Sequence, residues 1–354
     1  MNKQKLVGTG GISYEEKKQR VYKMRIRTNI EIIGFAFLGC CILLFYFHEG
    51  IKLSESLFSD SFLTFNVVFI SILLEALPFV LIGVLIAGVI QVFVSEEQMR
   101  KLIPRNKLLA IMMSCLVGAL FPACECGIVP IVRRLVSKGM PLFAGVGFLL
   151  TGPLINPIVI FSTYMAFGED GRMALLRMVL GLIIALIITS AICILFKHNQ
   201  LKITKESFRT EAQRMVNLPL LTRLKAMIEH AIDEFFDMGK FLIIGALLAA
   251  FVQTYISTRS ILALGNGLLG STLVMMGLAY LLSLCSEADA FIAASFDQIL
   301  PKTSLLGFLI YGPMLDLKNT IMLLSVFTFR FVITLTILIT ATVLAILLLV
   351  HPLI

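Results

Sequence analysis

Long apolar runs set the strongest limit on the fold of this chain. Residues 331–350 contain no charged side chain, and residues 62–94 contain one carboxylate. Apolar runs of about 18 residues or more are long enough to cross a membrane as helices. Only 15% of the 354 residues are charged, against about 25% in soluble domains. The sequence therefore predicts an all-α polytopic membrane protein in a lipid bilayer. The candidate segments are 30–47, 62–94, 108–135, 141–167, 173–196, 235–256, 261–296, 304–329 and 331–350.

The basic loops constrain how these segments cross the bilayer. If every segment crossed once from a cytoplasmic N-terminus, residues 197–230, with seven Lys and Arg, would lie outside. That placement opposes the tendency of short basic loops to stay on the cytoplasmic side. A hairpin over 108–135 that returns to the same side removes the conflict. We therefore expect about seven full crossings plus two re-entrant or broken-helix hairpins, 108–135 and 261–296, in a multi-pass protein of the cytoplasmic (inner) membrane.

An internal repeat supports this topology. Each half would hold three crossings and one hairpin, and an odd number of crossings inverts the second half relative to the first. Inverted repeats place a substrate site near the middle of the membrane, where interrupted helices meet. The matching positions are Glu75, Gly83, Gln91 and Ser95 with Asp237, Gly245, Gln253 and Ser257; Cys124 with Cys285; and Gly152, Pro153 and Asn156 with Gly312, Pro313 and Asp316.

The domain organisation follows from the repeat and the charges. Residues 1–28 form a basic cytoplasmic tail, and 29–61 hold the first transmembrane helix and an external loop. No small-residue cleavage site follows the first apolar run, so we interpret that run as an anchor and not a signal peptide. Transmembrane repeat 1 covers 62–196, a basic cytoplasmic linker covers 197–230, and transmembrane repeat 2 covers 231–354.

Carboxylates inside the apolar segments are candidates for function. Each costs about 2.5–3.5 kcal/mol on insertion scales, so pairing, protonation, water or a bound cation must offset it. Glu75 and Asp237 occupy matching repeat positions and are interpreted as coupling or structural acids. The intramembrane acids are Glu75, Glu125, Asp237, Glu287, Asp289 and Asp316.

The run Cys124-Glu125-Cys126-Gly127 is the sharpest local motif. Two thiols on a turn with a broken backbone are suited to soft metals or metalloids. The second half offers Cys285, Glu287 and Asp289 at the matching turn. A structural zinc site commonly uses two Cys-x-x-Cys pairs, which are absent. The candidate metal ligands are Cys124, Cys126, Glu287 and Asp289.

Two Gly-Pro breaks flank the same predicted site. Proline removes a backbone donor and frees carbonyl oxygens, as in the broken helices of transporters. Gly152-Pro153 precedes Asn156, and Gly312-Pro313 precedes Asp316, Lys318 and Asn319. Lys318 is interpreted as a counter-ion for a nearby acid. The predicted substrate-binding residues are Cys124, Glu125, Cys126, Asn156, Cys285, Glu287, Asp289, Asp316 and Asn319.

Four runs together resemble the ArsP/YraQ-like family of bacterial permeases over residues 62–330. The resemblance implies an inner-membrane permease; one branch of the family exports trivalent organoarsenicals through cysteines like Cys124 and Cys126. That branch usually has a small residue between the two thiols, whereas Glu125 stands here and favours a divalent cation. The chain is more similar to a branch associated with zinc-responsive genes and a small membrane partner subunit. The four runs are 122–130, 152–157, 286–291 and 312–319.

These observations favour a permease, not an enzyme, that moves a thiophilic solute such as the soft divalent cation zinc. Efflux of trivalent arsenicals is the alternative substrate, while a thiol–disulfide carrier and a non-transporting membrane subunit are alternatives of other classes. No phosphate-binding loop is present, and the basic residues lie in loops rather than on a nucleic-acid-binding face. We expect no permanently bound cofactor, with Zn²⁺ or a trivalent arsenical as substrate. The sequence leaves homo-oligomerisation open.

Overall fold

A computed structural model describes residues 60–353 apart from 105, 123, 197, 203–219, 256–264 and 266. The fold described is that of the unit Asp60–Ile354. The predicted cytoplasmic tail and the predicted first membrane helix, residues 1–28 and 30–47, lie outside the described residues, as does most of the linker 197–230. Residues 220–230 of that linker are helical and continue into the following membrane segment.

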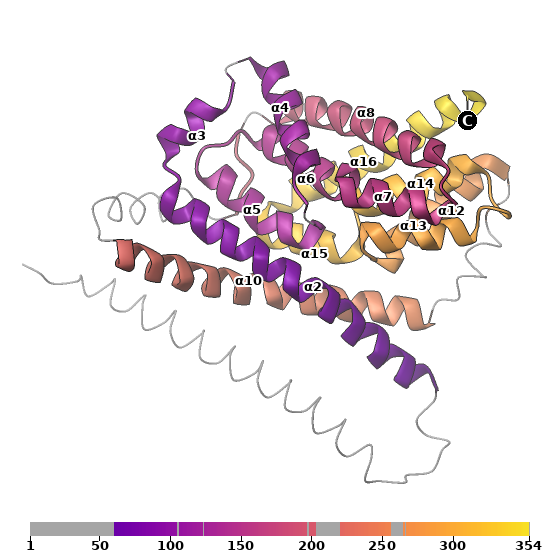
Figure 1. The fold of residues 1–354 in the computed structure, drawn as a ribbon, viewed down its shortest axis with the longest axis horizontal. Helices are drawn as coiled ribbons and strands as arrows, with labels where there is room; N and C mark the ends of the chain where they lie inside the picture. The colour runs from indigo at the N-terminus through magenta and orange to yellow at the C-terminus, as the bar shows by residue number, and fades with distance from the viewer. Residues whose placement is uncertain are drawn as a thin grey trace, which may run out of the picture. The chain divides into compact units, whose positions relative to one another are not determined.

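The described part of the chain is built of helices, with one isolated β-bridge between Leu201 and Phe327. Two halves of similar order follow one another, and Figure 1 shows them along the colour gradient. The first half comprises α2 (Asp60–Phe93), α3 (Glu96–Leu102), α4 (Lys107–Leu120), α5 (Glu125–Ser137), α6 (Leu142–Ile155), α7 (Pro157–Ala166) and α8 (Gly171–Leu195). The second comprises α10 (Leu220–Tyr255), α12 (Gly267–Leu282), α13 (Ser286–Ser295), α14 (Lys302–Met314), α15 (Leu317–Val326), α16 (Phe329–Val350) and η1 (His351–Leu353).

Among the described residues, five helical segments are long and apolar enough to cross a membrane. Large apolar side chains on them are exposed, for example Val67 and Leu74 on α2, as expected of surfaces that face lipid. The chain is thus an all-α polytopic membrane protein, as the sequence predicts. The five segments are Ser61–Phe93, Leu142–Ala166, Gly171–Leu195, Leu221–Tyr255 and Phe329–Val350.

The predicted segment 304–329 is not one continuous helix. Leu315 and Asp316 are extended between α14 and α15, and the Asp316 side chain caps α15. The same division occurs in the first half, where Asn156 is extended between α6 and α7 and caps α7. A cap side chain that accepts a bond from the next helix competes with continuation of the previous one. The break between α4 and α5 lies between Leu120 and Glu125. Cys124 is therefore at the predicted turn, whereas Cys126 and Gly127, which are predicted on the same turn, already belong to α5 because the helix begins at Glu125.

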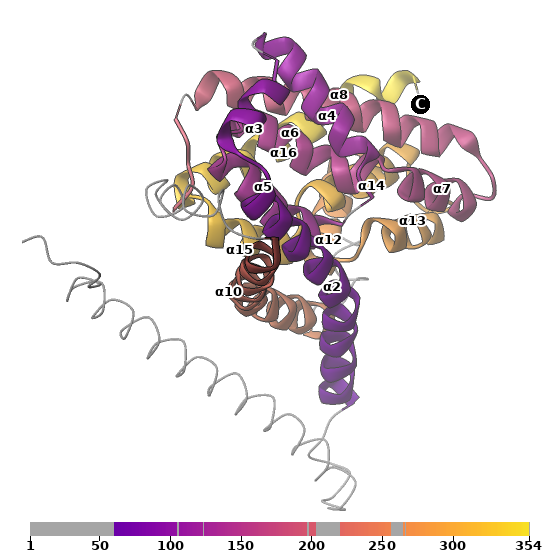
Figure 2. The same cartoon turned by 60° about the vertical axis from the view of Figure 1, so that its left-hand side comes forward.

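Two close helix crossings fix the short helices against the long ones. Gly83 of α2 faces Gly127 of α5 so closely that a Cβ at Gly83 would overlap the Gly127 carbonyl oxygen. At Gly245 of α10, a Cβ would lie 3.0 Å from the Cα of Lys318 on α15. Small residues permit such approaches between membrane helices. The long helices α2 and α10 also pack on each other, and both views show them side by side (Figure 1, Figure 2).

Candidate functional site

Four short helices begin after a break in the chain, and their N-cap residues form two matching pairs. Asn156 and Asp316 cap α7 and α15: Asn156 Oδ1 accepts from the Val159 amide over 2.9 Å, and Asp316 Oδ1 accepts from the Asn319 amide. Cys124 and Cys285 are the N-caps of α5 and α13, and neither makes a side-chain capping bond. The two thiols thus occupy matching positions at the start of the two helices.

The first turns of α5 and α13 meet directly. Ser286 Oγ donates to Glu125 Oε1 over 3.2 Å, and both residues are buried. Cys126, also buried on α5, interacts with Cys124 next to this contact. The structure thus brings the Cys-Glu-Cys motif of the first half against the matching turn of the second half.

The start of α15 supplies a buried cation to the same region. Lys318 Nζ donates to the Ser283 carbonyl over 3.1 Å and lies 3.6 Å from Asp316 Oδ2. Ser283, two residues before Cys285, has a positive φ of 48° and its hydroxyl accepts from the Leu317 amide. The pairing with Asp316 agrees with the counter-ion role expected of Lys318. Its charge also interacts with the Cys-Glu-Cys motif of α5.

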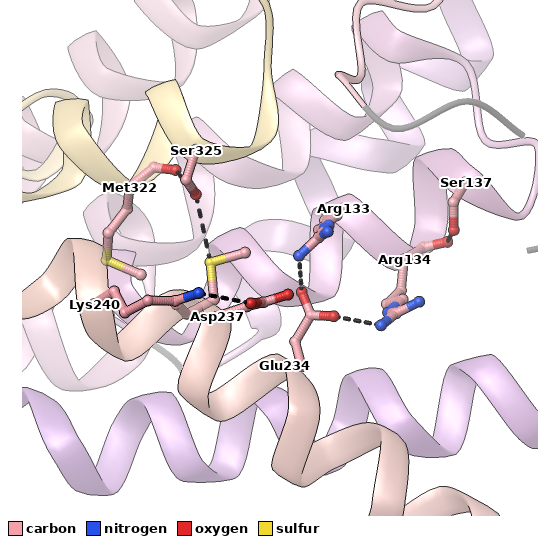
Figure 3. A network of polar contacts seen from close by, with 9 residues as sticks. Arg133, Arg134, Ser137, Glu234, Asp237, Lys240, Met322 and Ser325 are labelled. Atoms are coloured by element: carbon pink, nitrogen blue, oxygen red, sulfur yellow. Dashed lines mark hydrogen bonds and ion pairs between the residues drawn. The ribbon is translucent and has the colours of Figure 1, made fainter. Parts of the chain in front are cut away.

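The two acids at matching repeat positions have different surroundings. Glu75, on α2, is half-buried and interacts with the Cys285 thiol. Asp237, on α10, is exposed and pairs with Lys240 over 3.0 Å. Only Glu75 of this pair therefore belongs to the candidate site. Figure 3 shows Asp237 and Lys240 together on the helix surface.

Asn156, predicted to contact the substrate, uses its side chain for hydrogen bonds to the two helices that it joins, α6 and α7. Its Oδ1 caps α7, and its Nδ2 donates to the Gly152 carbonyl over 3.2 Å. On α13, Glu287 is half-buried and Asp289 is buried, with Gly312 of α14 close to the Asp289 carboxylate. Asn319 is buried in the first turn of α15.

Arg177 is a site residue that the motif analysis missed. It lies on α8, is fully buried, and donates to Thr163 Oγ1 over 2.7 Å and to the Ser286 carbonyl over 3.1 Å. The signal was present in the sequence, because Arg177 interrupts the apolar run 173–196. A buried intramembrane cation is as costly as an intramembrane acid and marks a functional position by the same reasoning.

Several buried oxygens of the site have no hydrogen-bond donor within the described protein. Such atoms cost free energy unless water, a proton or a cation satisfies them. The carboxylates of Glu75, Glu125, Asp289 and Asp316 outnumber the two buried cations, Arg177 and Lys318, so positive charge is lacking. The oxygens without a hydrogen bond in the described protein are Glu75 Oε1, Glu125 Oε2, Asn319 Oδ1 and Asp316 Oδ2, the last of which is ion-paired with Lys318.

The predicted metal ligands do not form a preassembled metal site. Within the part of the chain that the structure describes, no three or more His, Cys, Asp or Glu side chains are grouped so as to hold a metal ion. Cys124 and Cys126 interact with each other, while Glu287 and Asp289 lie on α13. The arrangement offers two soft ligands beside unpaired oxygens, and not a closed structural site.

At its C-terminal end α5 carries an ion-pair cluster, which Figure 3 shows from close by. Glu234 of α10 accepts from Arg133 over 2.7 Å and from Arg134, and all three residues are buried. Lys138 donates to the Gln91 carbonyl of α2 over 2.7 Å, and burial lowers the pKa of Lys138. From Glu125 to Arg133 the helix rises about 12 Å, so this cluster anchors the end of α5 away from the thiols.

Comparisons with known proteins agree with the membrane architecture. A family model described as predicted permease matches residues 61–351. The UPF0718 protein YcgR of Bacillus subtilis (strain 168) is 52% identical over 273 residues, which are 77% of this chain and 92% of that protein. A protein of Streptococcus mutans serotype c, named as a proposed subunit of a two-component membrane permease complex, is 39% identical over 265 residues, 75% of this chain and 87% of its own. No solved structure matches the chain.

Proposed function

Because the chain belongs to the ArsP_1 family of predicted permeases, we propose that this membrane permease moves a thiophilic cation, with zinc as the first candidate. One observation carries the proposal: Cys124 and Cys126 lie beside buried, unpaired carboxylate oxygens where the first turns of α5 and α13 meet. Soft thiol ligands and oxygen acceptors together suit a borderline-soft divalent ion.

Charge supports a cationic solute. If the carboxylates of the five acids at the site were all ionised, Arg177 and Lys318 would leave three negative charges without a matching cation. The five acids are Glu75, Glu125, Glu287, Asp289 and Asp316. Uncompensated buried charge is costly, so protons or a bound cation must neutralise it. A divalent ion would supply two of the three missing positive charges in one step, and its release would be compensated by protons.

The mechanism we propose is alternating exposure of this site. Two halves with the same order of helices, each broken before its short helices, are typical of transporters built from inverted repeats. Rocking of one half against the other would move α5 relative to α13 and open the Ser286–Glu125 contact to one side at a time. The cytoplasmic membrane with a cytoplasmic N-terminus is the location we propose, from the basic linker 197–230.

We also propose a partner subunit. The Streptococcus mutans relative is named as part of a two-component membrane permease complex, and the resemblance of the motifs points the same way. Wide exposed apolar surfaces on α2 and α10 leave room for a second membrane protein as well as for lipid.

The decisive experiment is elemental analysis of the purified protein by plasma mass spectrometry, with and without added Zn²⁺. Wild type should retain about one zinc per chain, as a site with two thiols and oxygen donors can. Cys124→Ser/Cys126→Ser should lose it. Cys193→Ser is the matched control, because Cys193 lies on α8 outside the motif and is also half-buried. Full zinc retention by the double variant would overturn the thiol site.

A trivalent arsenical is the second candidate, and one observation favours it. Two neighbouring thiols without a third grouped ligand can satisfy an organoarsenical, which needs no four-ligand shell. The same samples incubated with a trivalent organoarsenical separate the candidates. Thiol-dependent arsenic retention without zinc retention would replace zinc by the arsenical as substrate.

A further inference from the structure

Arg177 is more than a structural residue of α8. It is fully buried, donates to Thr163 and to the Ser286 carbonyl, and leaves its Nε without a hydrogen-bond partner. A guanidinium placed this way inside a membrane helix carries a large desolvation cost that an apolar side chain would avoid. The buried charge of Arg177 is therefore expected to have a functional role.

Its bonds link the two halves at the candidate site. Thr163 and Arg177 belong to α7 and α8 of the first half, and Ser286 begins α13 of the second. The Ser286 carbonyl accepts from Arg177 while its hydroxyl donates to Glu125 over 3.2 Å. A continuous chain of hydrogen bonds therefore connects α7, through Arg177, to the first turns of α13 and α5.

Its charge acts on the same carboxylates that would attract a cation. Arg177 interacts electrostatically with Asp289, Glu287 and Glu125. Asp289 also interacts with Lys318, a second buried cation at the site. A fixed positive charge that acts on the acids of a cation site partly cancels their attraction for the cation.

We propose that Arg177 is a built-in counter-charge at the first turns of α5 and α13 that keeps cation binding weak enough for release. This inference rests on the proposed function. Transport needs binding that is strong enough for entry and weak enough for exit, and a fixed guanidinium beside the site sets that balance. Removing its charge should tighten binding and slow turnover.

The test compares equilibrium Zn²⁺ binding to the purified full-length protein with Zn²⁺ transport in proteoliposomes. Arg177→Gln should bind Zn²⁺ at least about tenfold more tightly than wild type and transport it more slowly at saturation. Arg177→Lys keeps the charge and should restore the dissociation constant to within about threefold. Arg172→Gln is the matched control, because Arg172 lies exposed on the same helix. A purely structural role would lower binding and transport together in Arg177→Gln.

Two outcomes overturn the inference in distinguishable ways. Equal Zn²⁺ affinity of Arg177→Gln and wild type would refute the counter-charge while the thiol site stands. Absence of Zn²⁺ binding by wild type would refute the proposed function as well. If Arg177→Gln does not accumulate, Asp289→Asn and Asp289→Asn/Arg177→Gln replace the pair, because the double variant removes one acid and one cation together and leaves the net charge of the site as it is in wild type. The double variant should again bind about tenfold more tightly than the single one, and equal affinities would refute the inference.

Discussion

Ser286 donates a hydrogen bond to Glu125, and these two residues follow the matching N-cap cysteines of α13 and α5. Where two equivalent segments are related by a two-fold axis, a residue touches its own counterpart only close to that axis. The contact is therefore the one expected if the two halves form an inverted repeat. It would place the Cys-Glu-Cys motif on the axis, where neither half alone can complete a binding site.

Glu125→Gln should weaken zinc binding without lowering the stability of the folded protein. The amide keeps an acceptor for Ser286 but removes the charge, so we expect zinc retention to fall at least about tenfold. The unfolding midpoint in detergent should stay or rise, because a buried unpaired carboxylate oxygen is costly. Glu229→Gln, an exposed acid at the start of α10, is the control and should change neither quantity. Unchanged zinc retention in Glu125→Gln would remove this carboxylate from the site.

Gly83→Ala should disrupt the crossing of α2 and α5. A Cβ at Gly83 would overlap backbone atoms of Gly127, so the helices must separate, at a cost of about 1–3 kcal/mol. Because Gly127 follows Cys126, the thiols should shift as well. Gly239→Ala in α10 is the matched control, since nothing lies within 4 Å of its added Cβ. Thermal unfolding in detergent should show Gly83→Ala destabilised and Gly239→Ala unchanged or slightly more stable; equal midpoints would contradict the close crossing.

Glu234→Gln should be strongly destabilising. It removes the charge that two buried arginines, Arg133 and Arg134, share, and breaking a buried pair costs about 3–5 kcal/mol. Asp237→Asn breaks the neighbouring exposed pair with Lys240 and should cost about 1 kcal/mol or less. Chemical denaturation of the two variants in the same detergent measures the difference. Similar costs would mean that the Glu234 cluster is solvated in the protein.

The helix breaks could be predicted because local chemistry determines them. Glycine and proline stand shortly before the breaks that precede α7 and α15, and Asn156 and Asp316 are good N-cap residues, so the positions of these two breaks follow from the sequence alone. The meeting of Glu125 with the second half could be expected only through the repeat, because their separation along the chain is too large for any local rule.

The surroundings of Arg177 and Asp237 could not be predicted in this way. A charge in the apolar run of α8 is visible in the sequence, but its partners Thr163 and Ser286 come from the packing of α8 on α7 and α13. Asp237 matches Glu75 in the repeat, yet it pairs with Lys240 on the surface of α10. Equivalent positions keep equivalent surroundings only where both halves pack alike, and α2 contacts α5 whereas α10 contacts α15.

The topology prediction has a direct test in cysteine labelling of intact cells. Lys101 and Arg172 are exposed, and between them lie the segments 108–135 and 141–167. If 108–135 returns to the side from which it enters, only one crossing separates the two positions, and they face opposite sides of the membrane. A membrane-impermeant maleimide should then label Arg172→Cys in intact cells and Lys101→Cys only after permeabilisation. Glu229→Cys, exposed at the start of α10, is the control and should behave like Lys101→Cys, since basic loops stay cytoplasmic. Labelling of Lys101→Cys and Arg172→Cys from the same side would show that α4 and α5 together cross the bilayer. Each half would then contain an even number of crossings, and an even number excludes an inverted repeat.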